Sequence, residues 1–297
     1  MAEATSGQVR YYAPMIIDFH THVFPPEVRE KRDEYLRRDE SFRELYGSPK
    51  AAIATADELL VSMDAAGVDV SVACGFAWHD GELCVRHNDY LLEAAAQSSG
   101  RLIAFCTVQP SDKGARDELK RCASGGARGL GELRPQSQGY GLIDSEEADL
   151  LAWAADAYDL ALLFHASEPV GHRYPGKAGL PLDQLWRFIE DFPGITVIAA
   201  HWGGGLPFFA LMPEVHDVLG RCYVDTAATS LLYRPEVYAR GIELVGADRI
   251  LFASDFPLIA QERALEEVSD AVEPIDEEAR RLILGDNARG LLRLPAG

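Results

Sequence analysis

The sequence lacks long hydrophobic runs. No window reaches the ~18 consecutive apolar residues that a membrane-spanning helix needs, and the opening MAEATSGQVR has no apolar region of the kind found in signal peptides. The five cysteines are odd in number and none shows Cys-x-x-Cys spacing, which argues against a disulfide framework and a zinc ribbon. We therefore expect a cytoplasmic protein with reduced thiols and no membrane partner.

Basic residues are also scarce. The chain has 28 lysines and arginines against 47 aspartates and glutamates, which gives a formal net charge of −19. Such a surface repels nucleic acid and anionic membranes, so we expect neither as a partner. A small-molecule substrate is the expected partner, and a homodimer is a reasonable default for a soluble enzyme.

The chain also lacks internal repeats, low-complexity tracts and Gly/Ser linkers, so we expect one domain over residues 1–297. Short apolar runs alternate with amphipathic segments, which favours a parallel sheet covered by helices. No Gly-x-Gly-x-x-Gly follows the first strand, so we predict a (β/α)8 TIM barrel rather than an open sheet. The eight expected strands are MIIDF, DVSVACG, LIAFCTV, ARGLGEL, ALLFH, TVIAAH, CYVDTA and RILFASD. A charged helical insertion is expected at about residues 24–55.

Polar residues gather at the ends of these strands, where the active site of such a barrel lies. Each has an ordinary interpretation alone: His165 could cap the core, Asp255 could be a turn residue, and Glu132 could pair with Arg134. Together they form a set of imidazoles and carboxylates, which are ligands for a cation such as Zn²⁺. The strand-end residues are His20, His22, Glu132, Arg134, His165, His201, Asp225, Thr226 and Asp255.

Several segments resemble the amidohydrolase superfamily, most closely its amidohydrolase-2 group. They are DFHTH, GARGLGEL, LLFHASE, VIAAHWGGGLPF, YVDTA and ILFASDFPL. That group contains metal-dependent hydrolases and decarboxylases of the aminocarboxymuconate-semialdehyde type. The resemblance implies that His20, His22, His165 and Asp255 bind the metal. The resemblance does not decide between one metal ion and two. With two ions, Glu132 would bridge them and His201 would bind the second; with one, His201 would polarise the substrate.

We expect a metal-dependent hydrolase of the amidohydrolase type. Metal-activated water would attack a small-molecule amide, ester or lactone, with Asp255 and His201 as the catalytic residues. The expected cofactor is a divalent metal, with Zn²⁺ favoured and Mn²⁺, Fe²⁺ or Co²⁺ also suitable.

Two other functions stay open at this point. One is a metal-dependent nonoxidative decarboxylase of an aromatic or unsaturated carboxylic acid, which would use the same ligands. The other is a binding protein that has kept the barrel and lost the chemistry. Arg134, Trp202, Trp78 and Tyr140 follow strand ends, so they are the candidate substrate-binding residues. The glycines of HWGGG form either a tight turn or a close approach to an anion.

Overall fold

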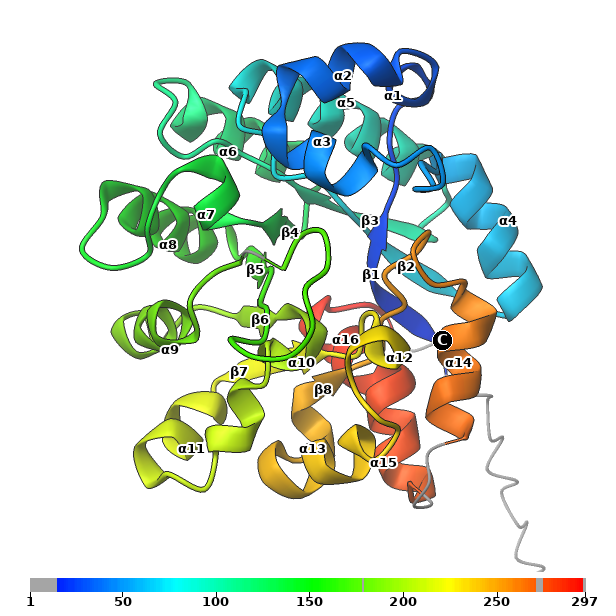
Figure 1. Cartoon of the computed structure of the whole chain (residues 1–297), viewed down its shortest axis with the longest axis vertical. Coiled ribbons are helices and arrows are strands. Elements are labelled where there is room, and N and C mark those ends of the chain that lie inside the picture. Colours follow the sequence, from blue (N-terminus) through cyan, green and yellow to red (C-terminus); the bar gives the residue numbers. More distant parts are fainter. Residues whose placement is uncertain (1–14, 178, 271–274, 296–297) are drawn as a thin grey trace, which may run out of the picture.

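A computed structural model describes residues 15–177, 179–270 and 275–295, so the opening MAEATSGQVR lies outside the described residues. Eight parallel strands follow one another around a barrel in chain order, with helices outside them (Figure 1). This arrangement confirms the predicted (β/α)8 fold. The strands are β1 (Ile17–His22), β2 (Val70–Cys74), β3 (Leu102–Cys106), β4 (Gly129–Leu133), β5 (Ala161–Phe164), β6 (Val197–Ala199), β7 (Cys222–Asp225) and β8 (Ile250–Leu251).

Backbone hydrogen bonds join the last strand to the first. The amide of Phe19 donates to the carbonyl of Phe252 over 2.8 Å, and the amide of Asp255 donates to the carbonyl of His20 over 2.9 Å. These contacts satisfy edge groups that an open sheet would leave unpaired. The barrel therefore closes beside the residues that carry the candidate metal ligands.

Helices follow the strands on the outside of the barrel. Helix α4 illustrates how the sequence sets their bounds, because Thr55 and Glu58 form a capping box at its start and Gly67 ends it with φ of 75°. The first helices are α1 (Pro26–Glu30), α2 (Arg32–Arg38), α3 (Glu40–Tyr46), α4 (Ala56–Ala66), α5 (Gly81–Gln97), α6 (Ala115–Ser124), α7 (Pro135–Gln138), α8 (Glu146–Tyr158) and α9 (Leu182–Asp191).

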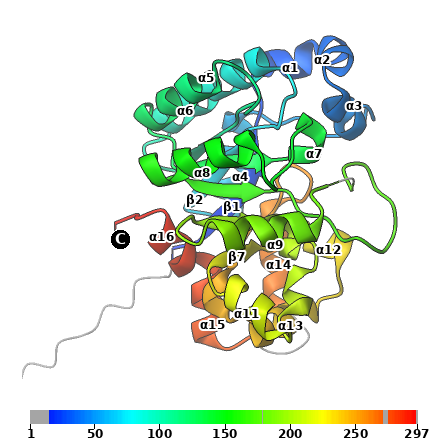
Figure 2. The ribbon, with the colours of Figure 1, turned by 90° about the vertical axis from the view of Figure 1, so that its left-hand side faces the viewer.

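The second half of the chain has shorter helical segments. Figure 2 shows α3, α7 and α12 on one side of the barrel and α16 on the other. The segments are α10 (Ala200–Gly203), η1 (Leu206–Phe209), α11 (Pro213–Leu219), α12 (Thr229–Leu232), α13 (Val237–Val245), η2 (Ala247–Arg249), α14 (Gln261–Ser269), α15 (Glu277–Arg281), η3 (Leu282–Asp286) and α16 (Asn287–Leu291). Within the described ranges, no helix combines the length and the apolar character that crossing a bilayer requires.

An aromatic cluster holds helices α1–α3 against the barrel. Phe42 of α3 stacks on Trp78 with ring centroids 5.1 Å apart, and Phe24 stacks on His87 at 5.1 Å. Aromatic pairs at such distances add to the stability that burial provides. The inserted helices are thereby fixed next to the carboxyl ends of the strands, which we call the mouth of the barrel.

Candidate metal centre and active site

Strand β1 delivers two imidazoles to the mouth. The Nε2 atoms of His20 and His22 are 3.0 Å apart, and Oδ1 of Asp255 lies 3.3 Å from Nε2 of His22. Side chains two residues apart on a strand share a face, which explains why both histidines reach one point. His20, His22 and Asp255 offer ligand atoms within 4.8 Å of one another. This geometry suits a metal ion, because two facing imidazole nitrogens and a carboxylate are good ligands for a divalent cation.

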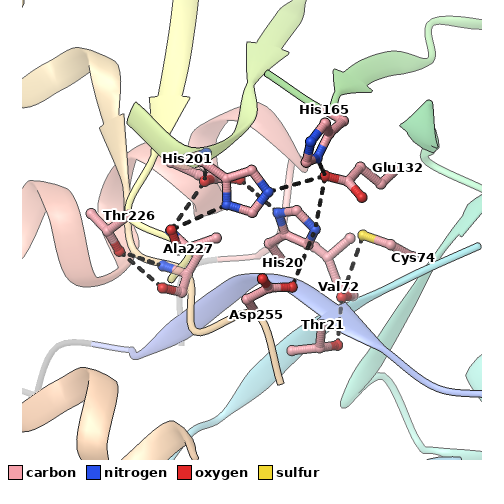
Figure 3. A network of polar contacts seen from close by, with 12 residues as sticks. His20, Thr21, Val72, Cys74, Glu132, His165, His201, Thr226, Ala227 and Asp255 are labelled. Atoms are coloured by element: carbon pink, nitrogen blue, oxygen red, sulfur yellow. Dashed lines mark hydrogen bonds and ion pairs between the residues drawn. The ribbon is translucent and has the colours of Figure 1, made fainter. Parts of the chain in front are cut away.

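A second group of ligand atoms adjoins the first. Nε2 of His201 lies 3.2 Å from Oε1 of Glu132, and Nε2 of His20 lies 3.8 Å from that oxygen (Figure 3). His20, Glu132 and His201 again offer atoms within 4.8 Å of one another. We call the five residues of the two groups (His20, His22, Glu132, His201 and Asp255) the candidate ligand cluster. Both groups depend on the same nitrogen of His20.

Asp225 orients two members of this cluster. Its Oδ2 lies 2.9 Å from Nδ1 of His20, and its Oδ1 accepts a hydrogen bond from the backbone amide of His201 over 2.8 Å. Burial lowers the pKa of His20, but Asp225, followed by Glu132 and Asp255, raises it to about 10. Asp225 therefore leaves Nε2 of His20 directed into the cluster.

The carboxylates of the cluster are ionised. Burial raises the pKa of Glu132, yet His165, His201 and His20 bring it well below its ordinary value. Burial likewise raises the pKa of Asp255, and the hydrogen bond with His22 and the nearby histidines lower it overall. Nδ1 of His22 is buried without a hydrogen-bond partner. The donor set of imidazoles and anionic carboxylates thus fits a divalent metal ion.

His165 contacts the cluster but points elsewhere. Its Nδ1 lies 2.8 Å from Oε1 of Glu132, whereas its Nε2 lies 2.9 Å from Oγ of Ser167 and 3.0 Å from the carbonyl of Gly176. Both ring nitrogens are therefore occupied by protein atoms. The structure brings His165 to the site through Glu132 rather than into either group of ligand atoms.

The predicted substrate-binding residues separate into two kinds. Arg134 is 4% exposed at the mouth, and its Nη2 donates to the carbonyl of Gly176 over 2.8 Å, so it is not paired with Glu132. The other three lie in the packed interior: Nε1 of Trp78 donates to His87, Nε1 of Trp202 donates to Thr229, and Tyr140 packs in the hydrophobic core. Because all three side chains are buried in packing contacts, we do not assign Trp78, Trp202 or Tyr140 to substrate binding.

The turn after β6 has an unusual backbone. His201, Trp202 and Gly203–Gly205 all have positive φ, and a Cβ added to Gly204 would lie 2.8 Å from backbone atoms of Ser167. Glycine tolerates this conformation at little steric cost. The glycines thus form the tight turn, which packs directly on the segment after β5.

The sequence predicts no function for two residues of the site, Asp225 and Asp18. Asp225 was visible as a strand-end carboxylate, but only the structure reveals its contact with His20. Asp18 lies two residues before His20 and accepts hydrogen bonds from the amide of Ser254 over 2.9 Å and from Nε2 of Gln261 over 2.8 Å. It therefore ties β1 to the segment that carries Asp255. The available signal was an acidic residue inside an otherwise buried strand.

The chain is similar to known decarboxylases. A family model described as amidohydrolase matches residues 17–294. Gamma-resorcylate decarboxylase from Polaromonas sp. is 23% identical over 284 residues, which cover 80% of this chain and 83% of that protein. The enzyme of the same name from Rhizobium sp. is 25% identical over 260 residues, which cover 72% of this chain and 76% of that protein.

Solved structures share the fold. The 5-carboxyvanillate decarboxylase from Sphingomonas paucimobilis superposes with a TM-score of 0.76 at 19% identity, covering 95% of this chain and 100% of that chain. The dihydroxybenzoic acid decarboxylase from Polaromonas sp. has bound manganese and the inhibitor 2-nitroresorcinol. It superposes with a TM-score of 0.72 at 19% identity, covering 96% of this chain and 98% of that chain.

These relatives correct the predicted activity. The expectation of a metal-dependent hydrolase is wrong, because the matching proteins are decarboxylases. The physical reason for the error is that both reactions use the same ligand residues, so the strand ends alone could not separate them. The preference for zinc over other divalent metals also finds no support, since solved relatives hold manganese.

Proposed function

Because this chain belongs to the amidohydrolase family, we propose that it is a metal-dependent decarboxylase that acts on an aromatic or unsaturated carboxylic acid without an oxidant. The convergence of His20, His22, Glu132 and Asp255 on one mouth supports a metal-dependent reaction. The observation that carries decarboxylation over hydrolysis is the similarity to gamma-resorcylate decarboxylases over most of this chain. The fold shared with other aromatic-acid decarboxylases supports it further.

The proposed cofactor is one divalent ion per chain, manganese or zinc. His20, His22 and Asp255 would hold it, with Glu132 and His201 beside them. When bound, the ion would withdraw electrons from substrate oxygens and so stabilise the negative charge that develops as the carboxylate leaves. One ion is favoured over two because a single nitrogen of His20 serves both groups of ligand atoms, while its other nitrogen faces Asp225.

The reaction also needs a proton. When the carbon–carbon bond breaks, its electron pair stays on the substrate carbon, which must then accept a proton in place of CO2. Nε2 of His201 lies 3.2 Å from Oε1 of Glu132. Burial lowers the pKa of His201, yet this hydrogen bond and the nearby Asp255 and Asp225 raise it to about 9, which favours the protonated imidazole. We assign to His201 the role of delivering this proton. We assign to Asp255 the role of an ionised carboxylate that holds His22 in place.

Release of CO2 tests this function. We would load the protein with Mn²⁺, supply carboxyl-labelled 2,6-dihydroxybenzoate and 5-carboxyvanillate, and measure labelled CO2 together with deuterium uptake from heavy water at the vacated carbon. An Asp255→Asn variant should lose activity. An Asp39→Asn variant should retain it, because Asp39 caps helix α3 and belongs to neither group of ligand atoms. Absence of CO2 from an expanded panel of aromatic and unsaturated acids would contradict the proposal.

We also propose a cytoplasmic homodimer. All five cysteines are buried free thiols, which suits a reducing compartment. Phe208, Phe209, Leu211 and Met212 expose apolar side chains in and after η1, which suits contact with a second copy. Light scattering after gel filtration should give twice the mass of one chain, and a monomer would contradict the dimer.

A further inference from the structure

The backbone of Gly176 is held from three directions. The carbonyl of Gly176 accepts from Nη2 of Arg134 over 2.8 Å and lies 3.0 Å from Nε2 of His165. Its amide donates to Oε1 of Glu44 over 2.8 Å. Gly176 lies between β5 and α9, in a segment that Figure 2 shows projecting on the same side as α3 and α12. The ends of β4 and β5 and the inserted helix α3 therefore meet at this residue.

Gly176 has little room for anything larger. Its φ is 86°, and an added Cβ would lie 2.6 Å from Cδ2 of Leu45 and 3.3 Å from Nη2 of Arg134. Gly176 is thus packed closely between the insertion and the guanidinium. Its carbonyl is the polar group that Arg134 contacts in this structure.

Arg134 is a buried cation without an anionic partner. It is 4% exposed, its Nε has no hydrogen-bond partner, and no carboxylate among the described residues forms an ion pair with it. A buried charge is costly unless it is paired. A neutral carbonyl compensates a guanidinium only in part, whereas a carboxylate matches its two parallel N–H groups. Among the described residues, the guanidinium therefore lacks the anionic partner that its burial favours.

Arg134 lies outside the candidate ligand cluster. The imidazole of His165 stands between them: its Nδ1 faces Glu132 of the cluster, and its Nε2 faces the carbonyl that Arg134 contacts. Glu132 of the cluster and the carbonyl that binds Arg134 thus contact opposite nitrogens of one imidazole.

We propose that Arg134 binds a carboxylate that the substrate keeps, so that the preferred substrate is an aromatic dicarboxylate with its reacting carboxylate at the ligand cluster. This inference rests on the proposed function. Arg134 suits the retained group because an ion pair with the departing group is lost when neutral CO2 forms, and binding that is stronger in the ground state slows a reaction. The Gly176 carbonyl holds the guanidinium until the carboxylate displaces it.

Two ligands that differ by one carboxylate test the inference. 4-Hydroxyisophthalate and salicylate share a phenol with an adjacent carboxylate, and only the former has a second carboxylate. We would measure both dissociation constants by calorimetry on Mn²⁺-loaded protein. Wild type should bind the dicarboxylate roughly 10- to 100-fold more tightly. Arg134→Met should abolish this preference and change salicylate binding by no more than about twofold, while Arg134→Lys should keep part of the preference.

Arg32→Met is the matched control. Arg32 also donates to backbone carbonyls, those of Tyr46, Ser48 and Ala51, but within the insertion. This variant should retain the full preference for the dicarboxylate. Equal binding of the two ligands by wild type, a preference that survives in Arg134→Met, or a preference lost equally in Arg32→Met would overturn the inference.

Failure of this inference is distinguishable from failure of the proposed function. If the dicarboxylate binds through Arg134 but releases no CO2, the carboxylate subsite at Arg134 is supported and decarboxylation of that ligand is refuted. If CO2 leaves monocarboxylates and dicarboxylates with equal kcat/KM, and binding shows no preference, decarboxylation stands and the subsite is wrong.

Discussion

The Nδ1 atom of His20 lies 2.9 Å from Oδ2 of Asp225, and both side chains are fully buried. The contact joins the first strand of the barrel to the seventh. It leaves the other ring nitrogen of His20, Nε2, to face His22, Glu132 and Asp255. A residue outside both groups of ligand atoms therefore decides which atom of His20 is available for an ion.

Replacing this carboxylate should weaken metal binding. In Asp225→Asn the amide cannot stabilise the same orientation and charge of His20, so the affinity for Mn²⁺ should fall about 10- to 100-fold. Competition with a fluorescent chelator would measure the dissociation constant.

Asp39→Asn is the control for that measurement. Asp39 is also a buried carboxylate that accepts backbone hydrogen bonds, from Phe42 and His79, but it belongs to the cap of α3. Its replacement should leave the affinity for Mn²⁺ unchanged. Equal losses of affinity in the two variants would show that Asp225 acts through stability alone.

The metal content should be about one ion per chain, because a single imidazole nitrogen binds one ion. Mass spectrometry of protein purified without chelator or affinity tag would give the ratio. His22→Ala should lower the occupancy, since it removes one ligand from the group with His20 and Asp255. A ratio of about two in wild type would require a bridged pair of ions and would contradict the shared-nitrogen argument.

Stability should depend on the protonation of His87. Burial lowers the pKa of His87 to about 4 from its ordinary 6.5, so the unfolded chain binds the proton more readily than the folded one. This stabilisation is present above pH 6.5 and is lost as the pH falls toward about 4. Between pH 7 and pH 5 the free energy of unfolding should fall by about 2 kcal/mol through this group alone.

His87→Gln isolates that contribution. The variant loses a ring that accepts from Phe76 and Trp78, so it should be less stable at pH 7. The stability difference from wild type should then narrow by about 2 kcal/mol at pH 5, because glutamine does not titrate. Urea unfolding at the two pH values measures it, and a difference that stays constant would refute the prediction.

Gly204→Ala should destabilise the turn after β6. The added methyl would lie 2.8 Å from backbone atoms of Ser167, and the residue would keep a positive φ. We expect a loss of about 2–4 kcal/mol in the free energy of unfolding. Gly100→Ala is the matched variant, because Gly100 also has positive φ but nothing lies near its added methyl. It should cost about 1–2 kcal/mol, and equal costs would refute the contact.

The barrel and the gathering of polar strand ends could be predicted because both follow from periodicity. A parallel barrel brings all carboxyl ends to one mouth, so placing His20, His201 and Asp255 at strand ends places them together. Position along a strand does not determine which way a ring turns. Trp202 follows His201, but its backbone has φ of 55° and its indole reaches Thr229 in the interior.

The contacts of Arg134 were beyond prediction for a different reason. Its partner Gly176 lies in an irregular segment with no hydrophobic period, and the position of such a segment depends on what it packs against. Here the determinants are Glu44 and Leu45, far away in the sequence on α3. The sequence could not distinguish hydrolysis from decarboxylation either, since hydrolases and decarboxylases of this family share their ligand residues.

Barrel closure has a consequence for how the protein is made. The seam between β8 and β1 brings Asp255 beside His20 and His22, although these residues lie far apart in the sequence. As the ribosome synthesises the protein, the two imidazoles emerge with the first strand, whereas the carboxylate emerges only after the eighth. A nascent chain therefore carries two of the three residues proposed to hold the ion while strands β2 to β8 are still being made. We expect high-affinity metal uptake to wait until the barrel is complete.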